Sequence, residues 1–168
     1  MEGQPFFNTV AGLSVSLAGF ASLIAWLRDD ATTWDPINLW RVKTIVRHAL
    51  TIAALALVLS PIYSMGQSLA TTVRIGSVLI ILFEVADLLK NRHPDPEIWN
   101  PAYTWKVNIA GGSLYIAVQV VNLWLASLGL LQLGYLLLLG SPAGIFYNFV
   151  RELGRARQAT PPGSEGLG

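Results

Sequence analysis

VNIAGGSLYIAVQVVNLWLASLGLLQLGYLLLLGSPAGIFYNFV, residues 107–150, is the longest uncharged tract of the sequence. The hydrocarbon core of a bilayer is about 30 Å thick, and a helix of about 20 mainly apolar residues crosses it. One helix of 44 residues would be about 66 Å long at about 1.5 Å per residue. The tract therefore predicts two membrane-spanning helices, 107–127 and 132–150, joined by a turn near Ser127–Gln132.

Three further apolar segments come before this tract. They cover residues 7–27, 44–63 and 73–89. Only 12% of the residues are charged, whereas soluble domains average roughly 25%. The sequence predicts an all-α integral membrane protein, a bundle of five transmembrane helices in a single domain, residues 1–157. Residues 158–168 are rich in glycine, proline and polar side chains, and we expect a disordered cytosolic tail.

Lysine and arginine residues alternate between the two sides of these five segments. Arg74 is alone on one side, and the other side carries Arg28, Arg41, Lys43, Arg47, Lys90, Arg92, Lys106, Arg151, Arg155 and Arg157. Cytosolic loops are enriched in these two residue types. We therefore expect a multi-pass protein of the plasma (inner) membrane, surrounded by the lipid bilayer, with its N-terminus outside and its C-terminus in the cytosol.

Two segments on the expected cytosolic side share the pattern Trp-Asx-Pro-x-x-x-Trp-Arg/Lys-Val. They are residues 34–42 and 99–107, at an offset of 65 residues. Tryptophan is enriched at membrane interfaces, so we expect interface anchors at Trp34, Trp40, Trp99 and Trp105. The repeat predicts two helical hairpins in parallel orientation, to which a fifth helix is added. Convergent interface chemistry without duplication is the alternative.

Four ionisable side chains lie within the predicted spans at similar depth: Arg47, His48, Glu84 and Asp87. Charged groups inside a membrane are costly and usually face the interior of the bundle. One interpretation is an ion-pair network that holds the second span to the third, in which we pair Arg47 with Glu84. The other is a cytosolic vestibule for a cation or proton, since a histidine ordinarily changes charge near neutral pH.

A polar stripe follows one face of the fourth span. Its members are Asn108, Tyr115, Gln119 and Asn122, interleaved with small residues. Polar side chains in a bilayer need partners, so the stripe either bonds to neighbouring helices or lines a wet path. We favour helix packing.

Small residues mark close-packed helix faces, within one chain or between copies. The first span carries them on one side at Ala11, Ser14, Ala18, Ser22 and Ala25, with Gly12, Ser16 and Gly19 beside them. The fifth span has Gly140 and Gly144 on either side of Pro142, for which we favour helix packing over a hinge. We expect these faces to serve helix packing or the formation of a homo-oligomer.

The sequence carries no motif of an enzyme or a cofactor site. It has no cysteine and no basic stripe, so we expect neither thiol chemistry nor a nucleic-acid partner. His93, Asp95 and Glu97 are interpreted as part of a solvated linker and not as a metal site. We expect a non-enzymatic oligomeric channel or transporter for a small ion or solute. The alternative is a membrane scaffold or accessory subunit whose buried polar residues only hold helices together.

Overall fold

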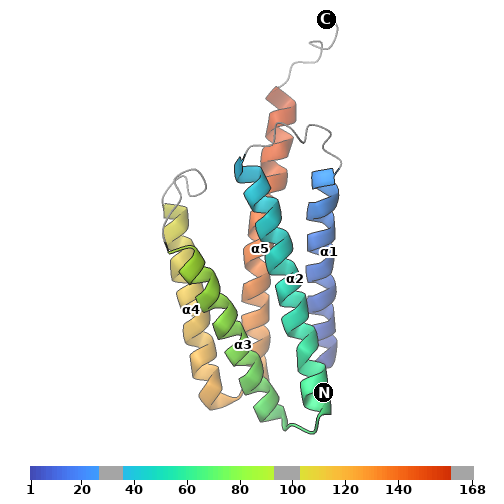
Figure 1. Cartoon of the computed structure of the whole chain (residues 1–168), viewed down its shortest axis with the longest axis vertical. Coiled ribbons are helices and arrows are strands. Elements are labelled where there is room, and N and C mark those ends of the chain that lie inside the picture. Colours follow the sequence, from blue (N-terminus) through green and yellow to red (C-terminus); the bar gives the residue numbers. More distant parts are fainter. Residues whose placement is uncertain (27–35, 93–102, 160–168) are drawn as a thin grey trace, which may run out of the picture.

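The structure is a computed structural model that describes residues 1–26, 36–92 and 103–159. These residues form five helices and no strand: α1 Gln4–Trp26, α2 Pro36–Ser64, α3 Leu69–Lys90, α4 Tyr103–Leu125 and α5 Leu128–Ala159 (Figure 1). Each is long and apolar enough to cross a membrane. The predicted all-α fold with five apolar helices is confirmed, and it is compatible with a multi-pass membrane protein.

Some predictions fall on residues outside the described ranges. They concern the anchors Trp34 and Trp99, the linker that holds His93, Asp95 and Glu97, and the tail from residue 160 onward. Helix α5 includes the first two residues of the predicted tail, because it continues to Ala159.

The turn between α4 and α5 is shorter than predicted and consists of Ala126 and Ser127. Two hydrogen bonds to Asn122 close it: its carbonyl accepts from the Ala126 N–H at 2.8 Å, and its Oδ1 accepts from the Ser127 N–H at 2.9 Å. Ala126 has a φ of 49°, in the left-handed region. The turn therefore lets α5 begin at Leu128, four residues earlier than the predicted start at Gln132.

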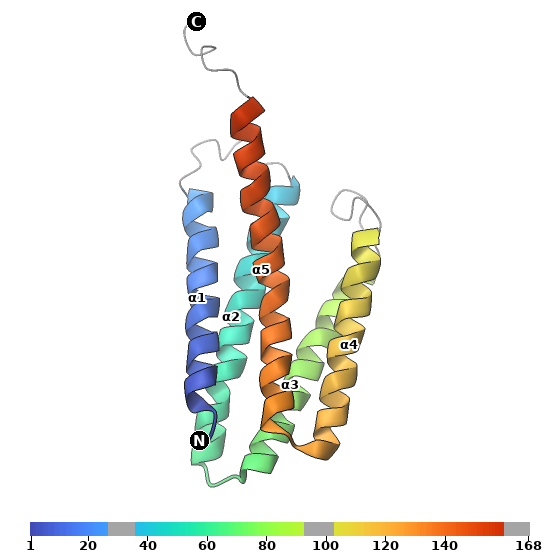
Figure 2. The ribbon, with the colours of Figure 1, turned by 180° about the vertical axis from the view of Figure 1, so that it is seen from behind.

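The helices form two antiparallel hairpins, α1–α2 and α3–α4, and α5 lies between them (Figure 2). Helices α1, α3 and α5 run in one direction and α2 and α4 in the other (Figure 1). Helix α1 begins at Gln4 and α3 at Leu69, which is also the offset between the two copies of the sequence pattern. The duplication itself stays a prediction.

Among the described residues, α5 contacts all four other helices, whereas α4 contacts only α3 and α5. The apolar core lies where α1, α2, α3 and α5 meet. Its members have little or no exposed surface: Phe7, Val10, Ala11, Ile52, Ala53, Ala56, Leu59, Val73, Ile80, Leu131, Tyr135 and Leu138. Helix α4 is therefore held from one side only.

The small residues divide into packed and unpacked sets. Ala11, Ser14 and Ala18 are buried in the bundle, so this side of α1 serves packing within the chain. A Cβ added at Gly12, Gly19, Gly140 or Gly144 would meet no atom within 4 Å. The expectation that Gly140 and Gly144 pack a helix is thus not met within the described part of the chain.

Candidate functional site

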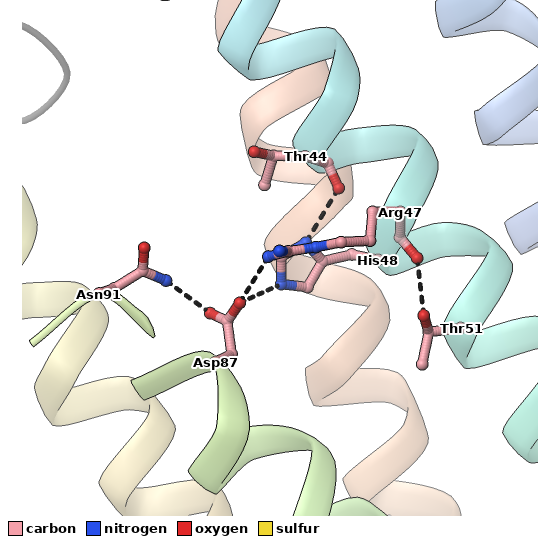
Figure 3. A network of polar contacts seen from close by, with 6 residues as sticks. All are labelled: Thr44, Arg47, His48, Thr51, Asp87 and Asn91. Carbon is pink, nitrogen blue, oxygen red and sulfur yellow. Dashed lines mark hydrogen bonds and ion pairs between the residues drawn. The ribbon is translucent and has the colours of Figure 1, made fainter. Parts of the chain in front are cut away.

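Asp87 is the centre of a polar cluster between α2 and α3 (Figure 3). Its Oδ1 lies 2.7 Å from Nη2 of Arg47 and 3.2 Å from Nε2 of His48. Its Oδ2 accepts a hydrogen bond of 2.9 Å from the Asn91 side-chain amide. Three donors therefore bind this carboxylate, which joins the two hairpins near the ends that carry Trp40 and Lys90.

His48 is held at both ring nitrogens. Nδ1 lies 2.9 Å from the main-chain carbonyl of Thr44, and Nε2 faces Asp87 (Figure 3). Because a carbonyl and a carboxylate are both acceptors, the two contacts are hydrogen bonds together only when each nitrogen carries a proton. The ring also meets Phe83 edge-on, with centroids 5.4 Å apart. The imidazole is therefore fixed in one orientation.

Glu84 lies three residues before Asp87, deeper in α3, and only 8% of its surface is exposed. It makes no hydrogen bond or ion pair with any residue that the structure describes. The sequence interpretation that paired Arg47 with Glu84 is therefore wrong, because the guanidinium is bound to Asp87. Both acids lie on one face of α3, and the one nearer the helix end meets Arg47.

A cavity of about 240 Å³ lies beside Glu84 between α3, α4 and α5. Its lining residues are His48, Glu84, Asp87, Leu88, Val107, Asn108, Gly111, Gly112, Tyr115, Leu138, Gly140 and Ser141. Gly112 allows α4 to approach, since a Cβ there would lie 3.1 Å from Oε2 of Glu84 and 2.9 Å from Leu88. The cavity is thus lined by two carboxyl groups, of which Asp87 is already bound, and by three glycines.

A second cavity of about 30 Å³ shares four lining residues with the first: His48, Asp87, Asn108 and Ser141. It is lined also by Trp40, Lys90 and Asn91. The two cavities adjoin at these four residues, and we call them together the vestibule. Its lining residues extend from Trp40 and Lys90, near one end of the bundle, to Glu84 and Tyr115.

The predicted polar stripe on α4 is divided by the structure. Asn108 and Tyr115 line the vestibule, whereas Gln119 and Asn122 have no exposed surface and bond to Ser77 of α3. The Ser77 hydroxyl donates to Oε1 of Gln119 at 2.9 Å and accepts from Nδ2 of Asn122 at 3.0 Å. The preferred interpretation, helix packing, therefore describes the second half of the stripe.

Gln119 reaches α5 as well. Its Nε2 donates to the carbonyl of Leu130 at 3.2 Å. Nearby, Nε of Arg74 donates to the carbonyl of Leu123 at 3.0 Å. We call Ser77, Gln119 and Asn122 the inter-helix knot, because these three side chains join α3, α4 and α5. None of the three lines the vestibule.

Sequence reasoning missed three contributors, Thr44, Asn91 and Ser77. Asn91 lies four residues after Asp87 on the same helix face, a spacing at which side chains meet. Ser77 has no such local signal, since its partners are more than 40 residues away. The indole of Trp105 donates to the Asn91 carbonyl at 2.8 Å, so this predicted anchor also links α4 to the cluster.

The described residues contain no group of three side chains arranged to hold a metal ion. The arrangement offers instead one ion-pair cluster, one buried carboxyl group beside a cavity and one closed hydrogen-bond network. Comparison of the chain with protein-family models, with curated proteins and with solved structures gives no match.

Proposed function

We propose that the protein is a small multi-pass transporter or channel, and that a small cationic solute enters it through the vestibule. One observation carries the proposal: Glu84 is buried beside a cavity of about 240 Å³ and has no partner among the described residues. Burying a carboxyl group without a hydrogen bond is costly, and intramembrane acids commonly mark ion pathways. A cation or proton that arrives from the vestibule would supply the missing partner.

We place the mouth of the vestibule on the cytosolic side of the plasma membrane. The ends of α1, α3 and α5 and the beginnings of α2 and α4 lie at this end of the bundle (Figure 1). Ten of the eleven cations belong to these ends or to the loops that join them, and cytosolic segments are enriched in cations. In this orientation the N-terminus is outside and the C-terminus is cytosolic.

Passage to the other side has to open the inter-helix knot or go around it. Ser77, Gln119 and Asn122 are fully buried and bonded to one another. Helix α4 contacts only α3 and α5, so a small movement of α4 would open the knot. Alternatively, a second copy would complete a path along the outward face of α1 that carries Gly12 and Gly19. We propose a homo-oligomer for this reason.

The test is solute flux in proteoliposomes that contain the purified chain. We expect uptake of a small cation or of protons, and we expect Glu84→Gln to reduce it at least tenfold while the protein stays folded. Glu2→Gln is the matched control, because it makes the same chemical change at an exposed carboxyl group. Absence of flux for protons, common monovalent cations and small amines would overturn the proposal.

A scaffold or accessory subunit is the second candidate. The observation that favours it is the full satisfaction of Asp87 by three donors and of the inter-helix knot by its own members. Buried polar groups of this kind hold helices together without moving a solute. The scaffold candidate is preferred under two conditions. The chain conducts no solute, and the Glu84→Gln variant restores the phenotype of a deletion strain as fully as the parent chain does.

A further inference from the structure

We propose that the cavity beside Glu84 binds a small organic cation, a protonated primary amine whose ammonium group donates to the Glu84 carboxylate and whose carbon body lies against α4 and α5. The inference rests on the proposed function, since it names the substrate class that would enter the vestibule. Three properties of the cavity carry it: its hydrogen-bonding capacity, its volume and its walls.

The unused hydrogen-bonding capacity of the cavity is that of an acceptor, so a ligand that donates hydrogen bonds fits it. Asp87 already accepts from Arg47, His48 and Asn91. Glu84 accepts a hydrogen bond from none of the described residues, although only 8% of its surface is exposed. A bound anion or a pure acceptor would leave this carboxylate unpaired, whereas an ammonium group brings three donors and one positive charge.

The volume of the cavity calls for carbon atoms as well as a charge. It holds about 240 Å³, whereas an engineered apolar cavity of about 150 Å³ accepts benzene, and one water takes a share of about 30 Å³ in the liquid. A bare monovalent ion would fill a small part of this space. The described residues also offer no cluster of three metal-ligating side chains, so the site does not fit a metal ion.

The walls of the cavity suit an aromatic or short alkyl body. Leu88, Val107 and Leu138 are apolar, and Tyr115 adds an aromatic ring of the kind that attracts cations. Gly111 and Gly140 keep the space open, because a Cβ at Gly140 would meet nothing within 4 Å and one at Gly111 only the Tyr115 hydroxyl at 3.9 Å. Small-molecule sites commonly combine apolar walls with a few placed polar groups.

The test is calorimetric titration of the full chain in lipid nanodiscs with benzylammonium, and with benzyl alcohol as its uncharged counterpart. We expect benzylammonium to bind and benzyl alcohol to bind at least tenfold more weakly. We expect Glu84→Gln to lower the affinity for benzylammonium at least tenfold. Gly140→Leu should abolish binding by filling the cavity. Gly144→Leu is the matched control one turn further along α5, where the added side chain also meets open space but does not line the cavity.

Equal binding of the charged and uncharged probes, or equal binding to the chain and to Glu84→Gln, would overturn the inference and assign the cavity to an apolar occupant such as a lipid chain. No binding of benzylammonium or of the shorter ethylammonium to the folded protein would overturn it as well. Titration needs no gradient, so it is separate from the flux measurement. Binding of benzylammonium without any flux refutes the proposed function and supports the amine site. Proton flux without binding of benzylammonium supports the proposed function and refutes the amine site.

Discussion

Gly134 of α5 lies directly against the side-chain amide of Gln119 of α4, so closely that a Cβ on the glycine would overlap Nε2. This approach lets the Gln119 amide reach the Leu130 carbonyl, one turn before Gly134. The same amide group accepts from Ser77. The contact of a glycine with a buried glutamine thus determines how near α4 and α5 come at this end of the bundle.

Gly134→Ala is expected to lower the free energy of unfolding by about 1–3 kcal/mol, since the methyl group displaces Gln119 and breaks a buried hydrogen bond. The measurement is unfolding in mixed detergent micelles. Gly144→Ala is the control, where open space surrounds the new methyl group. It should raise stability by about 0.5–1 kcal/mol, as a Gly→Ala exchange in a helix does. Equal effects of the two changes would contradict the importance of the close approach.

Ser77→Ala removes the hydroxyl group at the centre of the inter-helix knot. Gln119 loses a donor and Asn122 an acceptor in a fully buried place, so we expect a loss of about 1–3 kcal/mol. Ser16→Ala is the comparison, because that exposed hydroxyl donates only to the Gly12 carbonyl of its own helix. Its effect should stay under about 0.5 kcal/mol. Unfolding in mixed micelles again provides the measurement.

Asp87→Leu leaves Arg47 and His48 without their shared acceptor. We expect a loss of about 1–3 kcal/mol, below the roughly 3–5 kcal/mol of a fully buried pair, because 40% of the Arg47 side chain is exposed. Arg47→Leu combined with Asp87→Leu should recover part of this loss, as a double-mutant cycle in mixed micelles would measure. Strict additivity of the two single changes would mean that the contact contributes no stability.

Ala126→Gly should stabilise the protein by about 0.5–1 kcal/mol. Ala126 has a φ of 49°, a conformation that is roughly 1–2 kcal/mol unfavourable for a residue with a Cβ and open to glycine. Part of the gain is offset by the greater freedom of glycine in the unfolded chain. The prediction is checked by the unfolding midpoint in mixed micelles, with Ala117→Gly in the middle of α4 expected to shift it in the opposite direction.

The orientation in the membrane is testable because the chain has no cysteine. Single cysteines at Arg92, after α3, and at Gln67, between α2 and α3, occupy exposed positions at opposite ends of the bundle. A membrane-impermeant maleimide should label Gln67→Cys in intact cells, and Arg92→Cys only after permeabilisation. The reverse pattern would contradict the orientation that the distribution of cations predicts.

The number of helices was predictable from the sequence because the length of each uncharged, apolar segment is a strong signal. The end of α4 was not, since Asn122 and Ser127 close a two-residue turn through side-chain hydrogen bonds that hydropathy does not describe. The turn therefore begins one residue before the stretch in which it was predicted, Ser127–Gln132.

The charged residues of the candidate site were predictable, but their pairing was not. Depth and helix face placed Arg47, His48, Glu84 and Asp87 near one another, and the structure brings three of them into contact. Glu84 and Asp87 share a face of α3 and differ by less than one turn. The two positions lie about 4.5 Å apart along the helix axis, so the position of α2 along α3 decides which acid meets Arg47, and that position depends on core packing over the whole bundle.

The place of α5 between the hairpins has a consequence for biogenesis. In the part of the chain that the structure describes, α2 and α3 make the only direct contact between the α1–α2 and α3–α4 hairpins, and α5 contacts all four helices. Because a chain is synthesised from its N-terminus, four helices are complete before the helix that joins them. Until α5 is made, the core residues of α1, α2 and α3 lack Tyr135 and Leu131 as neighbours, and among the described residues the α2–α3 contact alone holds the two hairpins to each other.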